Sequence, residues 1–309
     1  LYATLEQALD DAKGKDGLVI KLLCDVKLEH AYVVEEDYPN FTLDLNGHTV
    51  SAKGTVFSTR STFTVKDSVG TGGICSSGAN ATAIYVQAGT LTVTGGSIHA
   101  DRANAIRVEG DNTETPDSKL VVGGGTFTGL SNAVVINGGT IELAGGVIGT
   151  PGSGFYGLYI GSNSTESIFR DGVVHGICYE SFGGVQRPLM ESLAENTAFA
   201  FGAPYSEENL LNANKTWETH ETVSLGHHEN HFFNGSDVCA CGRMASVSVT
   251  AGQSVTYYAT LKEAVAYASQ VENSVVKLWD NVSDSSIVID TGTFTIDFNA
   301  LMWSASSTT

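Results

Sequence analysis

The sequence predicts an all-β-dominated chain that folds as a right-handed parallel β-helix. This solenoid has about six coils, an N-terminal capping helix and a small irregular helix-and-loop segment near the C-terminus. Three observations lead to this fold class. Glycine is abundant, at 35 of 309 residues, whereas charged residues make up only 16% of the chain. Apolar residues recur with a period of two inside repeated units. The start of the sequence also recurs near its end.

The first expected element is a helix that follows Thr4. Threonine is a favoured N-cap because its hydroxyl accepts a hydrogen bond from the first turn. A Leu-x-x-Ala spacing follows it and indicates one apolar helix face. The uncovered end of a β-helix would offer unpaired strand edges to other chains. We therefore expect this helix to cover that end, with a strand directly after it.

Four units between residues 83 and 177 carry the coil pattern. They begin at Ala83, Ala105, Ala133 and Gly157, so successive starts are 22, 28 and 24 residues apart. Residues 41–52 and 63–75 resemble earlier, degenerate coils. A period of two places each apolar set on one face of a strand, and stacked coils then bury a continuous column. The matched apolar positions are Ile84, Ile106, Val134 and Leu158; Leu91, Leu120 and Ile141; and Ile98, Phe127, Ile148 and Val174.

Glycines mark the corners of these coils. They recur at Gly73, Gly96, Gly125 and Gly146, before the third strand of successive coils. Tight corners between strands need a positive φ or a close approach of two backbones, and glycine permits both. An antiparallel sandwich is the alternative fold. It does not predict register-matched apolar positions over four units, so the β-helix is favoured.

A longer repeat sets the domain organisation. The first 26 residues resemble those from Tyr257 onward with an offset of 256 residues, as between Tyr2 and Tyr258. We therefore expect a capping helix plus β-helix over 1–184, a helical cap and His/Cys-rich linker over 185–246, and the start of a second, truncated module over 247–309. The chain is then a processed or excised piece of a tandem array, which also suits a start at Leu1 without a signal segment.

The segment between the repeats has its own expected elements. Residues 187–196 suit a helix, with Pro188 tolerated in its first turn. This helix would cap the C-terminal end of the solenoid, and Phe199 and Phe201 would pack against that end. Residues 207–213 suit a short helical turn.

A cluster of imidazoles and thiols in this segment is a candidate structural zinc site. Its proposed ligands are His227, His231, Cys239 and Cys241, because zinc prefers four nitrogen and sulfur ligands in a closed site. A single residue between the two cysteines is tighter than the common two-residue spacing. The alternatives are a solvent-exposed His-rich linker and a reducible Cys239–Cys241 pair. A metal here would pin a linker that has little core of its own.

Composition excludes several classes of protein. The 16 basic and 34 acidic residues give a net charge of −18, which repels phosphate backbones, so we expect no nucleic-acid partner. No apolar run reaches the ~18 residues that a membrane span needs. Cys24, Cys75 and Cys178 lie in apolar contexts and are expected to be buried free thiols.

Four motifs, at 2–5, 42–49, 192–201 and 231–242, extend over almost the whole chain. Through these motifs the sequence resembles the β-helix repeat modules of Gram-positive bacterial cell-surface, adhesin-like proteins. It implies large, secreted, wall-associated proteins built from several modules, and it supplies no catalytic residues. The family's last cysteine pair is usually C-x-x-C, so the C-x-C of this chain departs from the pattern.

Parallel β-helices also host polysaccharide lyases and glycoside hydrolases, whose catalytic residues would have to occupy outward positions of the coils. Glycoside hydrolysis needs two carboxylates about 5–9.5 Å apart, but Glu109 and Glu142 are expected on different faces. A lyase needs a basic residue beside several acidic calcium ligands, and Arg107 with Glu109 falls short of that. Asp44-Leu-Asn46-Gly47 opens like a calcium loop but lacks the distal glutamate, so we expect a plain turn.

One outward face suits ligand binding better. Aromatic rings beside amide and charged groups are a common composition of sugar sites, although exposed tyrosines also simply favour strands. The residues predicted to form this face are Tyr85, Gln87, Arg107, Glu109, Asn137 and Tyr159.

Together these observations predict a non-enzymatic, extracellular module of a tandem-repeat bacterial surface protein. It would act as a spacer and adhesion surface at the cell wall, with a glycan or another host surface ligand as its partner. It would also contact neighbouring modules of the same parent chain. It needs no cofactor beyond a possible structural zinc. The alternative function is that of a polysaccharide lyase or glycoside hydrolase of the β-helix class.

Overall fold

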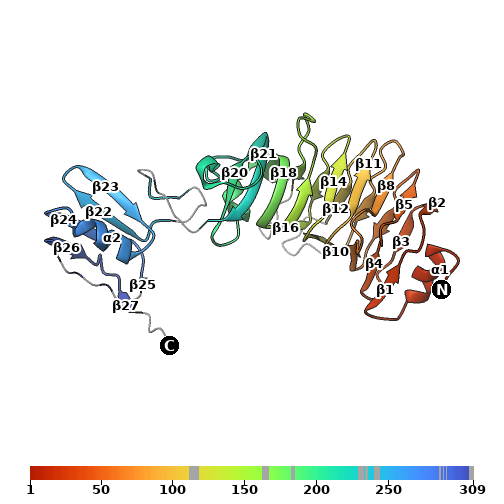
Figure 1. The fold of residues 1–309 in the computed structure, drawn as a ribbon, viewed down its shortest axis with the longest axis horizontal. Coiled ribbons are helices and arrows are strands. Elements are labelled where there is room, and N and C mark those ends of the chain that lie inside the picture. The colour runs from red at the N-terminus through yellow and green to blue at the C-terminus, as the bar shows by residue number, and fades with distance from the viewer. Residues whose placement is uncertain are drawn as a thin grey trace. The chain divides into compact units, whose positions relative to one another are not determined.

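The computed structural model describes residues 1–110, 118–161, 167–181, 185–228, 233, 236–239, 244–284, 287, 289 and 291–305. The chain divides into two compact units, Leu1–His227 and His228–Thr309. Each unit is described by itself, and both are drawn in Figure 1. Among the described residues, helices that combine the length and the apolar character required to cross a lipid bilayer are absent.

The first unit is a parallel β-helix, which confirms the predicted fold class. Its strands stack in three ladders. The first ladder contains β1 (Leu18–Lys21), β4 (Phe41–Asp44), β7 (Phe63–Lys66), β10 (Gly89–Val93), β13 (Ser118–Val122), β16 (Thr140–Ile148) and β18 (Ile168–Ser181). The second contains β2 (Val26–Leu28), β5 (Thr49–Ala52), β8 (Gly73–Ser76), β11 (Ser97–Ala100) and β14 (Thr126–Gly129), then the later parts of β16 and β18.

The third ladder contains β3 (Tyr32–Val34), β6 (Phe57–Thr59), β9 (Ile84–Val86), β12 (Ile106–Glu109), β15 (Val134–Asn137), β17 (Leu158–Ile160) and the end of β18. Each ladder therefore runs through seven levels of the described chain, so the expected number of about six coils was too low. The additional coil runs through β1 and β2. Its strands follow α1 directly, in the segment that the sequence analysis assigned to the capping helix and the strand after it.

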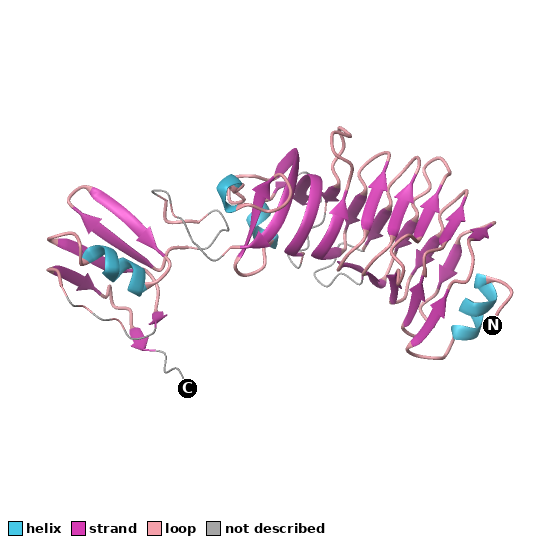
Figure 2. Ribbon diagram, in the orientation of Figure 1, coloured by secondary structure: helices cyan, strands magenta, loops and turns pink. Residues whose placement is uncertain are grey.

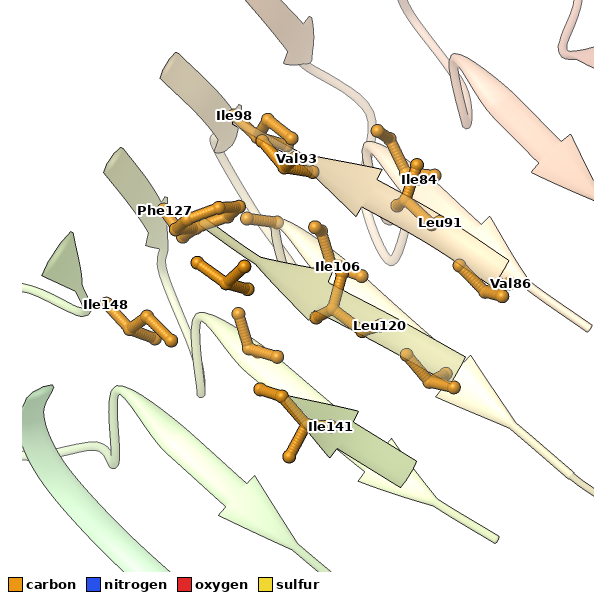
Figure 3. Packing of buried hydrophobic residues seen from close by; sticks show 14 of the residues in the cluster. Ile84, Val86, Leu91, Val93, Ile98, Ile106, Leu120, Phe127, Ile141 and Ile148 are labelled. Atoms are coloured by element: carbon orange, nitrogen blue, oxygen red, sulfur yellow. The ribbon is translucent and has the colours of Figure 1, made fainter. Parts of the chain in front are cut away.

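The core is the apolar column that the sequence predicted. Ile84 pairs with Ile106, and Ile106 with Val134, in one register. The matched side chains of neighbouring coils point to the same interior and are fully buried (Figure 3). Each Å² of apolar surface that the column removes from water contributes about 25 cal/mol to the free energy of folding. Burial of this surface along the whole column is the main stabilising contribution.

Backbone crowding explains the corner glycines. Gly96, Gly125 and Gly146 have φ values of +87°, +94° and +83°. A Cβ at Gly125 would lie 2.7 Å from the carbonyl oxygen of Gly96 in the coil before it. Glycine is therefore required at this corner by both its backbone conformation and the space available.

The Asp44–Gly47 segment is a turn, as predicted. The Asp44 carboxylate accepts hydrogen bonds from the backbone N–H of Asn46 at 3.0 Å and of Ser68 at 3.1 Å. Asp67, one coil later, accepts from the N–H groups of Gly47 and Gly72 at 2.7 and 2.6 Å. Burial alone would raise the pKa of Asp67, but these backbone donors outweigh it and hold the pKa below its ordinary value. Both carboxylates therefore fasten successive corners together.

The N-terminal helix α1 (Leu5–Ala12) covers the first coil, as predicted. The Thr4 hydroxyl accepts a hydrogen bond from the N–H of Gln7 at 3.3 Å. Leu5 and Leu9 are buried in the same hydrophobic cluster as the strands. The capping function thus follows from the apolar face of the helix.

The C-terminal end of the first unit is covered by strands rather than by the expected helix. β21 (Glu218–His227) pairs antiparallel with β18 on one side and with β20 (Thr197–Phe201) on the other. β19 (Val185–Gln186) also pairs with β18. The first unit therefore continues well past residue 184.

The helix predicted over 187–196 was wrong, because only a 3₁₀ turn, η1 (Leu189–Ser192), forms there. Leu193 leaves this turn in an extended conformation and forms a bridge to Phe169. The backbone N–H of Ala194 donates to the Phe169 carbonyl at 2.8 Å. Pairing with β18 thus competes successfully with helix formation.

Two smaller expectations had mixed outcomes. A short helical turn does form, as η2 (Glu207–Asn209). Phe199 is fully buried, but Phe201 is 36% exposed. Both side chains lie on the same side of the strand. They differ in exposure because Phe201 is the last residue of β20 and extends beyond the covered core.

The second unit repeats the start of the first, as Figure 2 shows for its helix and strands. Its elements are β22 (Val247–Ala251), β23 (Ser254–Tyr258), α2 (Leu261–Ala268), β24 (Ser274–Leu278), β25 (Val282–Asp284), β26 (Phe294–Asp297) and β27 (Trp303–Ala305). β24 pairs in parallel with β26, and β25 with β27, as β1 does with β4 and β2 with β5. Thr260 caps α2 in a full capping box with Glu263.

Candidate functional site

The six residues predicted to form a binding face lie together on the outside of the third ladder. We call them the third face: Tyr85, Gln87, Arg107, Glu109, Asn137 and Tyr159. Tyr85 pairs with Arg107, and Glu109 with Asn137, on directly adjacent strands. Tyr159 lies two levels beyond Arg107, next to Val135. The columns predicted from the sequence repeat are therefore the columns of the structure.

Glu109 is the centre of a hydrogen-bonded group on this face. The Arg107 Nε donates to one carboxylate oxygen, and the Asn137 Nδ2 donates to the other at 2.9 Å. The Arg107 and Glu109 side chains are 43% and 23% exposed. This arrangement fixes three polar side chains from two coils in one orientation, and each of these side chains carries more than one donor or acceptor.

Ser58 and Arg60 lie beside the start of the third face. The Gln87 Oε1 accepts from the Arg60 Nε at 3.2 Å and lies 3.4 Å from the Ser58 hydroxyl. Ser58 pairs with Tyr85 in the β6–β9 register. The sequence analysis missed both residues, although the alternation of residues 57–60 matches that of 84–87.

Tyr159 lies against the surface instead of standing out from it. Its hydroxyl donates to Glu180 Oε1, a residue that the sequence analysis missed. A Cβ on Gly161 would lie 2.9 Å from Tyr159 Cε1, so the ring passes over this glycine. Burial, and then the hydrogen bond to Glu180, raise the pKa of Tyr159 well above its ordinary value.

Two carboxylates flank Cys178 at the end of this face. Cys178 pairs with Glu218 in the β18–β21 register, and Glu218 accepts a hydrogen bond from the Tyr156 hydroxyl. The Tyr156 ring also stacks on His220, with 4.3 Å between ring centroids. Glu180 and Glu218 thus each accept a tyrosine hydroxyl, and this bonding holds the two rings in place.

Cys178 itself is a buried free thiol, as predicted. Burial, and then the charges of Glu180 and Glu218, raise its pKa to about 12. The thiol is therefore protonated near neutral pH, and the nucleophilic thiolate does not form there. By contrast, Cys24 is exposed and Cys75 half-buried, so the expectation of burial was wrong for Cys24, which lies between the short strands β1 and β2.

Glu142 lies on another ladder from Glu109, as the sequence predicted. It accepts from Lys119 Nζ at 2.9 Å and from Arg170 Nε at 3.2 Å. These hydrogen bonds hold its pKa below the ordinary value. A carboxylate paired with two cations stays ionised and is poorly suited to act as a general acid.

Only two of the four proposed zinc ligands, His227 and Cys239, belong to the described residues, and His231 and Cys241 lie outside them. His227 lies at the end of β21. Cys239 lies 3.2 Å from the Nε2 of His228, its neighbour in the second unit, and both side chains are buried. Among the described residues, three or more metal-binding side chains do not gather in one place. The zinc site stays a prediction.

Comparison of the chain with protein-family models, with curated proteins and with solved structures finds no match.

Proposed function

We propose that the chain is a non-enzymatic module of a tandem-repeat bacterial surface protein, located outside the cell, and that its third face binds glycans. The observation that carries this proposal is the Arg107–Glu109–Asn137 group beside the half-buried ring of Tyr85. Sugars are recognised by such combinations, in which an aromatic ring contacts the apolar side of the sugar and fixed polar groups bond its hydroxyls.

The dimensions of the face suit an oligosaccharide. Tyr85 and Tyr159 lie three levels apart on the third ladder, a separation of about 14 Å at the usual strand spacing. Because the whole chain carries a net charge of −18, neutral glycans are favoured over polyanionic ones.

A spacer role follows from the same fold. Seven stacked levels extend over about 29 Å at the strand spacing of ~4.8 Å, and each level contacts only its neighbours. The second unit repeats the β1–β4 and β2–β5 pairings in β24–β26 and β25–β27. This internal repetition supports a parent protein in which such modules follow one another and contact their neighbours.

A glycan array tests the binding proposal. We expect the purified chain to bind a set of neutral oligosaccharides and Tyr85→Ala to lose at least about tenfold in affinity, the equivalent of ~1.4 kcal/mol. Thr92→Ala is the matched control, because Thr92 is a half-buried outward residue of the first ladder. An array without bound glycans, or equal loss in both variants, would overturn the proposal.

The same glycans decide between binding and catalysis. If the chain were a polysaccharide lyase or glycoside hydrolase, prolonged incubation would release unsaturated products or new reducing ends. We expect neither. Either product would contradict a non-enzymatic function.

A further inference from the structure

The two copies of the repeated segment differ in one structural respect. β24 corresponds to β1 through the 256-residue offset, since Val275 and Lys277 match Val19 and Lys21. β24 has a strand on each side, β26 in parallel and β22 antiparallel. β1 has β4 on one side. In the described part of the chain, its other side pairs with no strand.

The strand on the second edge of β24 belongs to a hairpin. β22 pairs with β23 around a turn at Gly252, which has a φ of +61°. Ser248 lies opposite Lys277 in the β22–β24 register. The N–H of Trp279, directly after β24, donates to the Ser246 carbonyl at 2.9 Å.

The exposed edge of β1 has the matching geometry. The N–H of Leu22 points towards β4 and donates to the backbone carbonyl of Asp44 at 3.0 Å. Backbone N–H and C=O groups of successive residues point to opposite sides of a strand. The N–H and C=O groups of Val19, Lys21 and Leu23 therefore point away from β4. These three residues correspond to Val275, Lys277 and Trp279.

Side chains along β1 are more exposed than their counterparts along β24. Leu18 is 36% exposed, whereas its counterpart Ser274 is 1% exposed. Val19 and Leu23 are 56% and 66% exposed, against 38% for Val275 and 52% for Trp279. The edge of β1 therefore presents apolar surface that a neighbouring strand partly covers in the second unit.

A groove of about 690 Å³ runs beside this edge. It is formed by the first residues of the chain, the start of α1 and residues 18–27, and Leu1, Leu18, Val19 and Leu23 contribute apolar side chains to it. A groove of this composition next to an unpaired strand is the arrangement used in strand addition, where main-chain hydrogen bonds give affinity and side-chain pockets give specificity.

We propose that the free edge of β1 is a strand-addition site for an uncharged β-hairpin with the pattern of β22–β23, bound antiparallel in the register that β22 has on β24. Residues 247–258 contain no charged side chain, so such a hairpin approaches this acidic chain without repulsion. Its first strand alternates the fully buried Val247 and Val249 with hydroxyl residues. The hairpin provides hydrogen-bond partners for Val19, Lys21 and Leu23, and its valines cover the apolar groove.

The test joins a copy of residues 245–256 directly ahead of Leu1 in the full chain, because Leu1 corresponds to Tyr257. Hydrogen exchange of the Val19, Lys21 and Leu23 amides is then followed by NMR. We expect exchange at these three positions to slow by about tenfold or more, the consequence of new backbone hydrogen bonds. Unchanged exchange would overturn the proposal.

Two matched variants make the result specific. Thr250→Pro in the added copy removes a backbone donor that faces β1, and Val19→Pro removes an edge N–H while the β1–β4 pairing is retained. We expect either substitution to restore fast exchange, and persistent protection would contradict the proposed register. Sedimentation of the chain without the added copy tests whether a second copy of the chain occupies this edge instead. If β1 becomes protected as the chain dimerises, the site serves a second copy, and the hairpin proposal fails.

Discussion

Gly161 determines how Tyr159 is presented on the third face. It has room for the tyrosine ring only because it lacks a Cβ, which would lie 2.9 Å from Tyr159 Cε1. In Gly161→Ala we expect the ring to be displaced and its hydrogen bond to Glu180 lost. The pKa of Tyr159 then falls towards its ordinary value of 10.0.

Spectrophotometric titration measures this change. Gly161→Ala is expected to show one more tyrosine ionising near pH 10 than the wild type, whereas Tyr159→Phe, the control, gains none. Identical titration curves for the wild type and Gly161→Ala would show that the ring does not depend on this glycine.

His175 gives the first unit a pH dependence of stability. Its Nδ1 lies 2.7 Å from the Thr222 hydroxyl, and burial lowers its pKa below the ordinary 6.5. Protonation is therefore harder in the folded than in the unfolded chain. The resulting stabilisation is present above pH 6.5 and is lost as the pH falls below that value towards the folded-state pKa.

Urea unfolding of the first unit between pH 7.5 and 5 tests this dependence. We expect the midpoint to fall with pH in the wild type and to fall less in His175→Gln. The carboxylates with lowered pKa values, Asp44, Asp67 and Glu142, stabilise the folded chain equally across this range, since their ordinary values are 3.8 and 4.5 and their contribution is lost only at more acidic pH. Equal slopes in both proteins would contradict a half-buried, neutral His175 imidazole.

At the scale of the elements, the coil corners are sensitive to the addition of a side chain. Gly125→Ala places a Cβ 2.7 Å from the Gly96 carbonyl at a φ of +94°, and we expect a loss of about 1–3 kcal/mol. Gly54 has no atom within 4 Å of its added Cβ, so Gly54→Ala is expected to be neutral or to stabilise by about 0.4–1 kcal/mol. Thermal unfolding compares them, and equal effects would contradict backbone crowding at the corner.

The elements also show which features a sequence can predict. Alternating apolar residues predicted the strands and the columns of the third face, because side-chain direction along a strand follows from local geometry. The first coil was not counted because the strand expected after the N-terminal helix was assigned to the cap and not to the solenoid. The helix over 187–196 was a local expectation, and the pairing of Leu193 with Phe169 overrides it. Glu180 and Glu218 meet tyrosines only through β18 and β21, contacts that a local pattern does not contain.

At the scale of the whole molecule, the chain has a separate main hydrophobic core in each unit. Phe127 is fully buried in the first and Leu261 in the second. We expect Phe127→Ala to cost about 3–5 kcal/mol and Leu261→Ala about 2–5 kcal/mol. Calorimetry should show each substitution shifting the transition of its own unit. A single transition shifted alike by both would contradict two independent cores.

The central claim is that the third face binds a glycan, and hydroxyl-radical footprinting tests it most directly. The chain is labelled with and without an oligosaccharide selected on the array, and the oxidation of individual tyrosines is compared. We predict that the glycan protects Tyr85 and Tyr159, while Tyr2 and Tyr267, which are 54% and 37% exposed, react unchanged. Protection elsewhere, with Tyr85 and Tyr159 unaffected while the glycan is bound, would contradict the claim.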